Sequence, residues 1–283
     1  MFVSEIKAQI KKKAPAACDD HYLNVTPGSI IHFVLLINNT HLINMNNRMK
    51  HISSSIYQIS LGFVNVFIIE DEGLTLIDTG PRGSAAKILN AIRRAGKNPY
   101  DIKQIILTHA QPDHAGSAEE LKRILRVPVL AHYHDARIAK YGIGFRNEMQ
   151  LTPGVKNWLI YQCMIRHSGI DIEPVAIAET LKDNDILPVL GGTRIIHTPG
   201  HTIGHICLLT EGGETLIAGD LLSNSLYLGL SVCYENMDDG LNSIRKTLQY
   251  DFTKITFGHG RAILKGAASE IRGTFDEYPY SFA

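Results

Sequence analysis

Residues 105–117 read IILTHAQPDHAGS. The stretch opens with apolar and β-branched residues, which are typical of a buried strand, and it then places His109, Asp113 and His114 in a polar turn. Imidazole and carboxylate groups at this spacing are typical of a metal site. Gln111 stands two places after His109, where a third imidazole would complete the cluster. Because a neutral amide is a poor ligand for transition metals, the role of residue 111 is the first question that the sequence raises.

Length and composition favour a globular protein that acts on a small molecule. The chain has 283 residues, of which 45% are hydrophobic, so it can bury the core of one domain or of one domain with an insertion. Its 28 basic and 28 acidic residues cancel, which argues against nucleic acid or an anionic membrane as a partner. The four cysteines form no CxxC pair, and the apolar runs are shorter than the roughly 20 residues of a membrane span. A cytoplasmic location is therefore expected.

The chain changes character near Met49. Residues 1–48 are rich in Asn towards their end and lack clear periodicity, and we expect them to form a poorly defined N-terminal extension. Residues 49–283 are expected to form the ordered domain, which begins with three β-rich runs separated by Gly and acidic turns. A mostly helical insertion at about 135–180 is a candidate lid.

Helices and strands alternate after Gly80. Apolar spacing predicts helices at 84–96 and 116–126, the second opened by Ser117 with a Glu three places on. Strands are expected at 102–108 and 127–133, and again from 186 onwards after the insertion. A helix near 238–249, a strand at 254–260 and a short helix from Gly266 complete the chain.

Polar residues follow the carboxyl ends of five expected strands. They are Asp78, His109, His201, Asp220 and His259. In layered α/β folds the loops at strand ends carry the chemistry, because the strands hold them rigidly. We therefore expect these side chains to meet at one edge of a sheet.

Several motifs together resemble those of the metallo-β-lactamase fold superfamily. They are LIDTG, THAQPDHAGS, TPGHTIGH, LIAGD and FGHG, in that order, and the resemblance covers about residues 53–265. The central HxHxDH signature of the family appears here as HxQxDH. The resemblance implies an α/β fold, a four-layer αββα sandwich with a metal centre along one edge.

The resemblance also implies which residues would hold metal. One ion would be held by His109 and His201 together with residue 111, and a second by Asp113, His114 and His259, with Asp220 between the two. Asp78 would support the loop without binding metal. For Gln111 we consider three roles: a solvated loop residue, a hydrogen-bond donor beside the site, and a weak ligand.

The residue types support metal-dependent hydrolysis independently of the resemblance. Imidazole and carboxylate suit zinc, and also iron or manganese, and three protein ligands with an open position are usual for a catalytic metal. One or two zinc ions could activate a water against an ester, lactone or thioester, with Asp113 orienting it or moving its proton. The protein would then be lactonase-like or glyoxalase II-like. A β-lactam is disfavoured, because Asp220 stands where the true β-lactamases of the family usually carry Cys or Ser.

Two other functions are considered. His109, His201 and Asp220 alone form the two-histidine, one-carboxylate set of non-haem iron oxygenases, and the iron-dependent sulfur dioxygenases of this fold are similar. A degenerate member that only binds its ligand is the third reading.

Other residues carry weaker expectations. Trp158 in the insertion and Tyr227 after Asp220 are candidate substrate contacts. His132 and His134 would share one face of a strand, and His205 is expected to be structural. The frequent dimers of the family also allow a homodimer.

Overall fold

The computed structural model describes residues 49–144, 149–165 and 171–275. Within them a seven-stranded and a five-stranded sheet account for most of the strands. The first has the order β1-β2-β3-β4-β5-β6-β8, with strands Lys50–His51, Ile56–Ser60, Asn65–Glu70, Leu74–Ile77, Ile102–Ile106, Val129–His132 and Glu179–Leu181. The second has the order β16-β12-β11-β10-β9, with strands Lys254–Thr256, Thr215–Ile217, Ile206–Thr210, Thr193–His197 and Ile186–Leu187.

Two short ribbons and seven helices complete the described elements. The ribbons pair β13 (Leu222–Ser223) with β14 (Gly229–Leu230), and β7 (Gln150–Leu151) with β15 (Cys233–Tyr234). The helices are α3 (Ala85–Arg94), α4 (Pro112–Ala115), α5 (Ala118–Leu125), α6 (Tyr133–Ala139), α7 (Val155–Ile160), α8 (Met237–Thr247) and α9 (Ala267–Phe275). Short helical turns lie at Pro99–Asp101, Tyr161–Ile165 and Glu211–Gly213.

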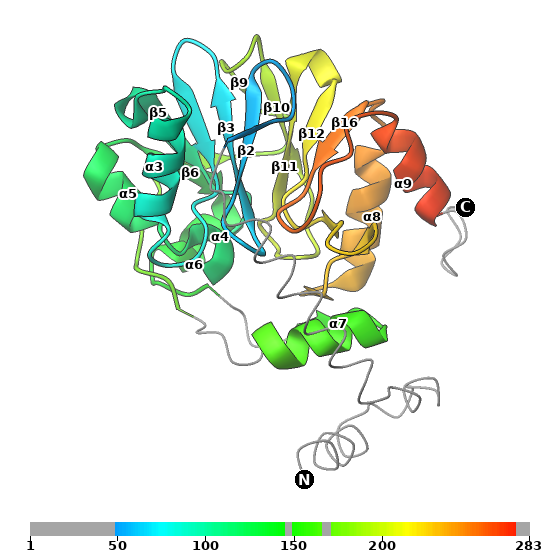
Figure 1. Cartoon of the computed structure of the whole chain (residues 1–283). Helices are drawn as coiled ribbons and strands as arrows, with labels where there is room; N and C mark the ends of the chain where they lie inside the picture. Colours follow the sequence, from blue (N-terminus) through cyan, green and yellow to red (C-terminus); the bar gives the residue numbers. More distant parts are fainter. Residues whose placement is uncertain (1–48, 145–148, 166–170, 276–283) are drawn as a thin grey trace. The chain divides into compact units, whose positions relative to one another are not determined.

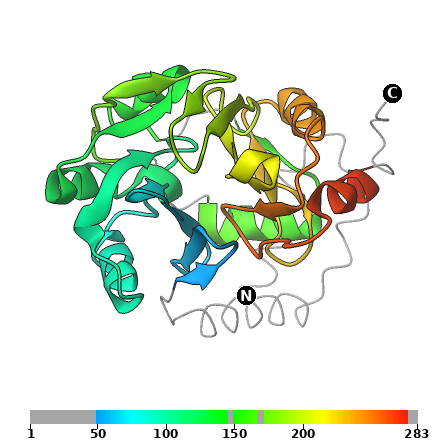
Figure 2. The ribbon, with the colours of Figure 1, turned by 90° about the horizontal axis from the view of Figure 1, so that it is seen from above.

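The two sheets face each other, and helices cover their outer sides (Figure 1). Strand β3 illustrates the reason, because its residues are buried on both faces. Val66 and Ile68 pack in the cluster that holds α3 and α5, whereas Phe67 and Ile69 pack in the cluster shared with the second sheet. A third cluster joins the second sheet to α8 and α9. The predicted four-layer αββα sandwich is confirmed, and the view from above separates the two halves (Figure 2).

Strand ends bring the expected loops to one edge of the sandwich. Strands β4, β5 and β6 are parallel neighbours in the first sheet, and β12 and β16 are parallel neighbours in the second. Asp78 and His109 follow β4 and β5, Asp220 and His259 follow β12 and β16, and His201 follows β10. Helix α7 of the insertion lies across the same end of the sandwich as α4 (Figure 1).

Most of the predicted ends of helices and strands lie close to the observed ones, and two predictions need correction. The strand expected at 127–133 ends at His132, and Tyr133 begins α6, where Asp135 in the first turn favours a helix start. His132 and His134 therefore do not share a strand face. Ser117 makes no capping bond to α5, because its hydroxyl donates to the Pro81 carbonyl and accepts from the Ser84 amide.

Some expectations fall on residues that the structure does not describe. The N-terminal extension at 1–48 lies outside the described residues, as do 145–148 and 166–170 of the insertion. Among the described helices, none has both the length and the apolar character needed to cross a membrane.

Asn65 ties the two sheets together next to the loop that carries His259. This residue is only 3% exposed. Its amide nitrogen donates to the carbonyls of Phe257 and Gly260 at 3.1 and 2.9 Å, and its backbone N–H donates to Gly258. Strand β3 thus fixes the segment after β16, at the edge where the polar residues gather.

We expect Asn65→Ala to lower the free energy of unfolding by about 1–3 kcal/mol, because one buried and one partly buried carbonyl lose their side-chain donor. Chemical denaturation measures this loss. Gln58→Ala is the matched control, since the Gln58 side chain donates to the Asn65 side-chain oxygen at 2.7 Å and its removal leaves both carbonyl bonds in place. Equal losses in the two variants would contradict the assigned role.

Candidate metal centre

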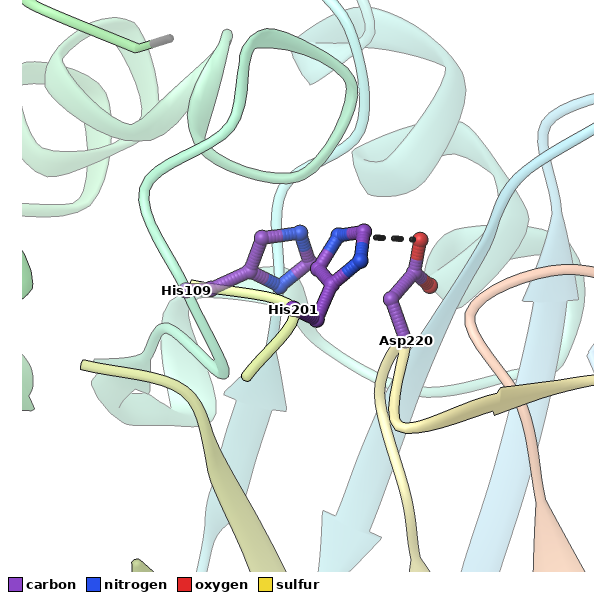
Figure 3. A group of neighbouring side chains, drawn as sticks. All are labelled: His109, His201 and Asp220. Carbon is purple, nitrogen blue, oxygen red and sulfur yellow. Dashed lines mark ion pairs between the residues drawn. The ribbon is translucent and has the colours of Figure 1, made fainter. Parts of the chain in front are cut away.

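Six side chains converge in two groups at this edge. The first consists of His109, His201 and Asp220, all buried, and the second of Asp113, His114 and His259. Within each group the potential ligand atoms lie within 4.8 Å of one another. Figure 3 shows the first group, with the two imidazoles and the carboxylate coming from three different loops and turned towards a common point.

Asp220 lies between the two groups. Its Oδ2 is 3.6 Å from His201 Nε2 and 3.1 Å from His259 Nε2, and its Oδ1 is 3.4 Å from His114 Nε2. One carboxylate thus reaches both sets of imidazoles. This is the position that a bridging ligand would need, and the assignment of the six residues as ligands stays a prediction.

Hydrogen bonds on the outer side of each ring orient the four imidazoles. The Nδ1 atoms lie 2.8–2.9 Å from acceptors outside the cluster: His109 from Thr108 Oγ1, His114 from Asp78 Oδ2, His201 from the Cys233 carbonyl, and His259 from the Phe63 carbonyl. Thr108 donates its own hydroxyl proton to Asp78, so its oxygen is left to accept. Because Nδ1 carries the hydrogen, Nε2 of each ring faces the cluster, as is usual for histidines that bind metal.

Three of the buried inward atoms form no hydrogen bond with the described residues. They are His109 Nε2, His114 Nε2 and Asp220 Oδ1, of which the last two lie 3.4 Å apart as an ion pair. Unpaired buried polar atoms are rare and destabilising in folded proteins, and several in one cluster indicate a group that the polypeptide itself does not supply. Imidazole nitrogen and carboxylate oxygen are ligands that zinc prefers. The donor set therefore fits a metal ion.

Gln111 belongs to the cluster and is not a solvated loop residue. It is 5% exposed, and its Oε1 lies 3.1 Å from His201 Nε2. Since burial lowers the pKa of His201 and Nδ1 donates to Cys233, the neutral ring presents the lone pair of Nε2 to the Gln111 amide. The amide can either donate a hydrogen bond to this nitrogen or bind a cation beside it through its oxygen, so both the donor and the weak-ligand roles stay open.

The protonation states of the cluster follow from its charges. Burial opposes protonation of His114 and His259, yet the nearby carboxylates, Asp220 above all, outweigh it: the pKa of His114 is raised well above its usual value and that of His259 to about 10. The pKa of Asp220 is lowered despite burial, mainly by His259 and His114. Without metal, two imidazolium ions thus balance the carboxylates. A metal ion would replace those two protons.

Two supporting residues were not assigned these roles from the sequence. Asp135 accepts hydrogen bonds from the Ala110 and Gly204 amides and from the Thr202 hydroxyl, so it joins the loops that carry His109 and His201. It follows the end of β6, and the strand-end pattern could therefore have identified it. His205, expected to be structural, accepts the Asp220 amide at Nε2 and contacts Thr198 through Nδ1.

Gly258 makes room for the Asp220 carboxylate. A Cβ atom at this position would lie 2.0 Å from Asp220 Oδ1 and 2.6 Å from His114 Cε1. The glycine in the FGHG motif is therefore required by close approach. Any side chain there would displace the two groups that face it.

The candidate substrate contacts are Trp158, in helix α7 of the insertion, and Tyr227, which contacts that helix. Tyr227 is 57% exposed, and its ring centroid is 4.2 Å from Lys156 Nζ of α7. Trp158 is half-buried on the same helix. Substrate binding by Trp158 and Tyr227 stays a prediction.

Outside the cluster, His132 stacks on His197 with ring centroids 3.9 Å apart.

Comparisons with known proteins identify the family. Residues 59–255 match the sequence profile described as the Metallo-beta-lactamase superfamily. The probable metallo-hydrolase YflN of Bacillus subtilis is 33% identical over 175 residues, 59% of this chain and 64% of that protein. A hydroxyacylglutathione hydrolase of Klebsiella pneumoniae is 27% identical over 142 residues, 48% of this chain and 41% of that protein. The matched region thus spans less than two thirds of either relative.

Solved structures support the fold. The subclass B3 metallo-beta-lactamase BJP-1 of Bradyrhizobium japonicum superposes with a TM-score of 0.60 at 19% identity, over 82% of this chain and 96% of that one. At this level of identity the likeness concerns the fold alone.

The raised pKa of His259 predicts how the metal-free protein responds to alkali. The folded form holds this proton more tightly than the unfolded chain, whose histidine titrates near 6.5. The resulting stabilisation is fully present below pH 6.5 and is lost as pH rises through about 10. We expect the free energy of unfolding of chelator-treated protein to fall by about 1–3 kcal/mol between pH 7 and pH 10.

Zinc-loaded protein should not show this fall, because a ligand imidazole is already neutral. His259→Asn, also measured without metal, should lose the part of the pH dependence that belongs to His259 and keep the part that belongs to His114. A metal-free protein as stable at pH 10 as at pH 7 would be inconsistent with a protonated His259.

Proposed function

Because this chain belongs to the metallo-beta-lactamase superfamily, we propose that it is a metal-dependent hydrolase that cleaves a small ester, lactone or thioester. The observation that carries the proposal is the convergence of two ligand groups on Asp220, with three buried inward atoms that have no hydrogen-bond partner. Unpaired buried polar atoms are rare in folded proteins, and a metal cation between the two groups would pair them. The relatives named as metallo-hydrolases support the reaction class.

Two metal ions, zinc by preference, would be held by the two groups. His109, His201 and Asp220 would hold one, with Gln111 as a weak fourth ligand, and Asp113, His114 and His259 the other, with Asp220 shared. Ions so placed lower the pKa of a water molecule and polarise a substrate carbonyl. Both iron and manganese are also compatible with these ligand types.

Asp113 is the residue of the cluster best placed to handle a proton. Its side chain is 27% exposed, against 5% for Asp220, and its Oδ2 lies 3.2 Å from His259 Nε2. Its pKa is lowered against the effect of burial by His114 and His259, so it is a carboxylate at neutral pH. It can accept a hydrogen bond from the attacking water and pass the proton to the departing alkoxide or thiolate.

Water is the only co-substrate that the reaction needs. The water oxygen bonds to the carbonyl carbon, the carbon–oxygen or carbon–sulfur bond breaks, and the proton released by the water goes to the leaving group. The similarity to a hydroxyacylglutathione hydrolase favours an acylated thiol. The zero net charge of the chain favours a small molecule over a polyanion, and Trp158 and Tyr227 would contact its acyl part.

A second candidate is an iron-dependent sulfur dioxygenase. The observation in its favour is the compact group of His109, His201 and Asp220, which has the composition of a facial triad. That reaction does not need the second group, which consists of Asp113, His114 and His259. The presence of this group therefore favours hydrolysis.

Metal content and turnover of Gln111→His test the proposal. An imidazole in place of the amide adds a nitrogen ligand where Gln111 now faces His201, so zinc should rise to two per chain. We expect kcat/KM on a panel of lactones and thioesters to rise about tenfold or more, because the substrate carbonyl would be polarised more strongly. Elemental analysis and steady-state kinetics measure both.

Gln249→His is the matched control, because it adds an imidazole at an exposed position and should change neither quantity. One iron per chain in the natural protein, with no hydrolysis of any substrate, would favour the dioxygenase. Two zinc ions in Gln111→His without turnover on the panel would count against a hydrolase.

A further inference from the structure

Lys156 is a buried cation for which the described residues supply no anion. It lies in α7 of the insertion and is 9% exposed. Its Nζ lies 4.2 Å from the centroid of the Tyr227 ring. Among the described residues no carboxylate forms an ion pair with it, in contrast to Lys97, Lys122, Lys246 and Lys254, which all pair with Asp or Glu.

The environment of Lys156 is unfavourable to its own charge. Burying an ammonium group is costly unless an opposite charge compensates it, and burial accordingly lowers the pKa of Lys156. The face of an aromatic ring attracts a cation but carries no net charge. The position therefore suits an ammonium whose counter-ion arrives with a ligand.

The segment next to Lys156 is hydrogen-bonded to the loops of the candidate metal centre. Tyr227 lies between β13 and β14, in the stretch that begins directly after Asp220. In that stretch the Asn224 amide donates to the His259 carbonyl at 3.0 Å, and the Ser231 hydroxyl donates to the Asp220 carbonyl at 2.6 Å. The loop that carries Tyr227 is therefore held to two of the predicted ligands.

The insertion is fixed to the same stretch just before Lys156. The Thr152 hydroxyl donates to the Ser231 carbonyl at 2.6 Å, and the Thr152 amide donates to Val232. Leu151 pairs with Cys233, whose carbonyl accepts from His201. The segment just before α7 is thereby tied to the stretch that also contacts His201 and Asp220.

We propose that Lys156 and the Tyr227 hydroxyl bind a carboxylate of the substrate, which makes the substrate a small acyl compound with a second, anionic group. The inference rests on the proposed hydrolase function and specifies its substrate class. The anionic group is not altered in the reaction, because water cleaves the acyl bond and the second carboxylate leaves with the acid product. Lys156 would act on binding and not on the chemical step.

The test compares two thioesters of N-acetylcysteamine, one succinyl and one butanoyl, on the zinc-loaded protein. They have acyl chains of the same length and differ in the terminal carboxylate. We expect KM for the succinyl thioester to be about tenfold lower, the effect of one charge-assisted contact, with similar kcat. Lys156→Met should abolish the difference, because it keeps the apolar stem and removes the charge, whereas Lys156→Arg should retain most of it.

Lys140→Met is the matched control. Lys140 also lies over a tyrosine ring, with its Nζ 6.0 Å from the centroid of Tyr141, but it is exposed. This variant should keep the preference for the succinyl thioester. Equal KM values for the two thioesters in the unsubstituted protein would overturn the proposal without any variant.

Binding of glutarate separates this proposal from the proposed function. Calorimetry on the zinc-loaded protein should give a Kd for glutarate at least about tenfold lower than for glutaramide, and Lys156→Met should remove most of that preference. If neither thioester is hydrolysed but glutarate binding depends on Lys156, the hydrolase proposal fails and the anion site stands. Glutarate binding that is unchanged in Lys156→Met contradicts the anion site.

Discussion

The candidate metal centre depends on the hydrogen bonds that hold the outer nitrogen of each imidazole. The acceptors are Thr108, Asp78 and the carbonyls of Cys233 and Phe63, and they come from separate loops. Each acceptor fixes one ring with its Nε2 towards Asp220. His109 is supported by its neighbour Thr108, whereas the other three rings are each supported by a residue from another segment, so the cluster is assembled only when these loops are in place. Metal binding and folding should therefore be coupled.

The sandwich supplies the rigidity that this arrangement requires. Both faces of each sheet are buried, one against helices and one against the other sheet, so the strand ends have little freedom to move. Asn65 and Asp135 then connect loops that belong to different strands. The insertion is held to the stretch between Asp220 and Tyr234, and Lys156 of the insertion contacts Tyr227 of that stretch. The proposed substrate contacts are thus tied to the loops that carry the predicted ligands.

The sequence predicted the parts of the site that follow from local pattern. A polar residue after each apolar strand identified His109, His201, Asp220 and His259, and the order of the motifs indicated the layers. The burial of Gln111, the support from Asp135 and the isolation of Lys156 could not be predicted, because each depends on residues distant in the chain. The predicted end of strand β6 at residue 133 was wrong for a different reason. The apolar strand ends at His132 and runs directly into helix α6, without a Gly or Pro between them.

Nitrogen NMR of the histidine side chains tests the central claim most directly. In zinc-loaded, 15N-labelled protein, long-range proton–nitrogen spectra report which ring nitrogen carries a hydrogen and which is bound to metal. His109, His114, His201 and His259 should each show a protonated Nδ1 and a metal-shifted Nε2. If any of these rings binds zinc through Nδ1, or if His109 and His201 are unaffected by zinc, the hydrogen bonds on the outer side of the rings do not define the centre.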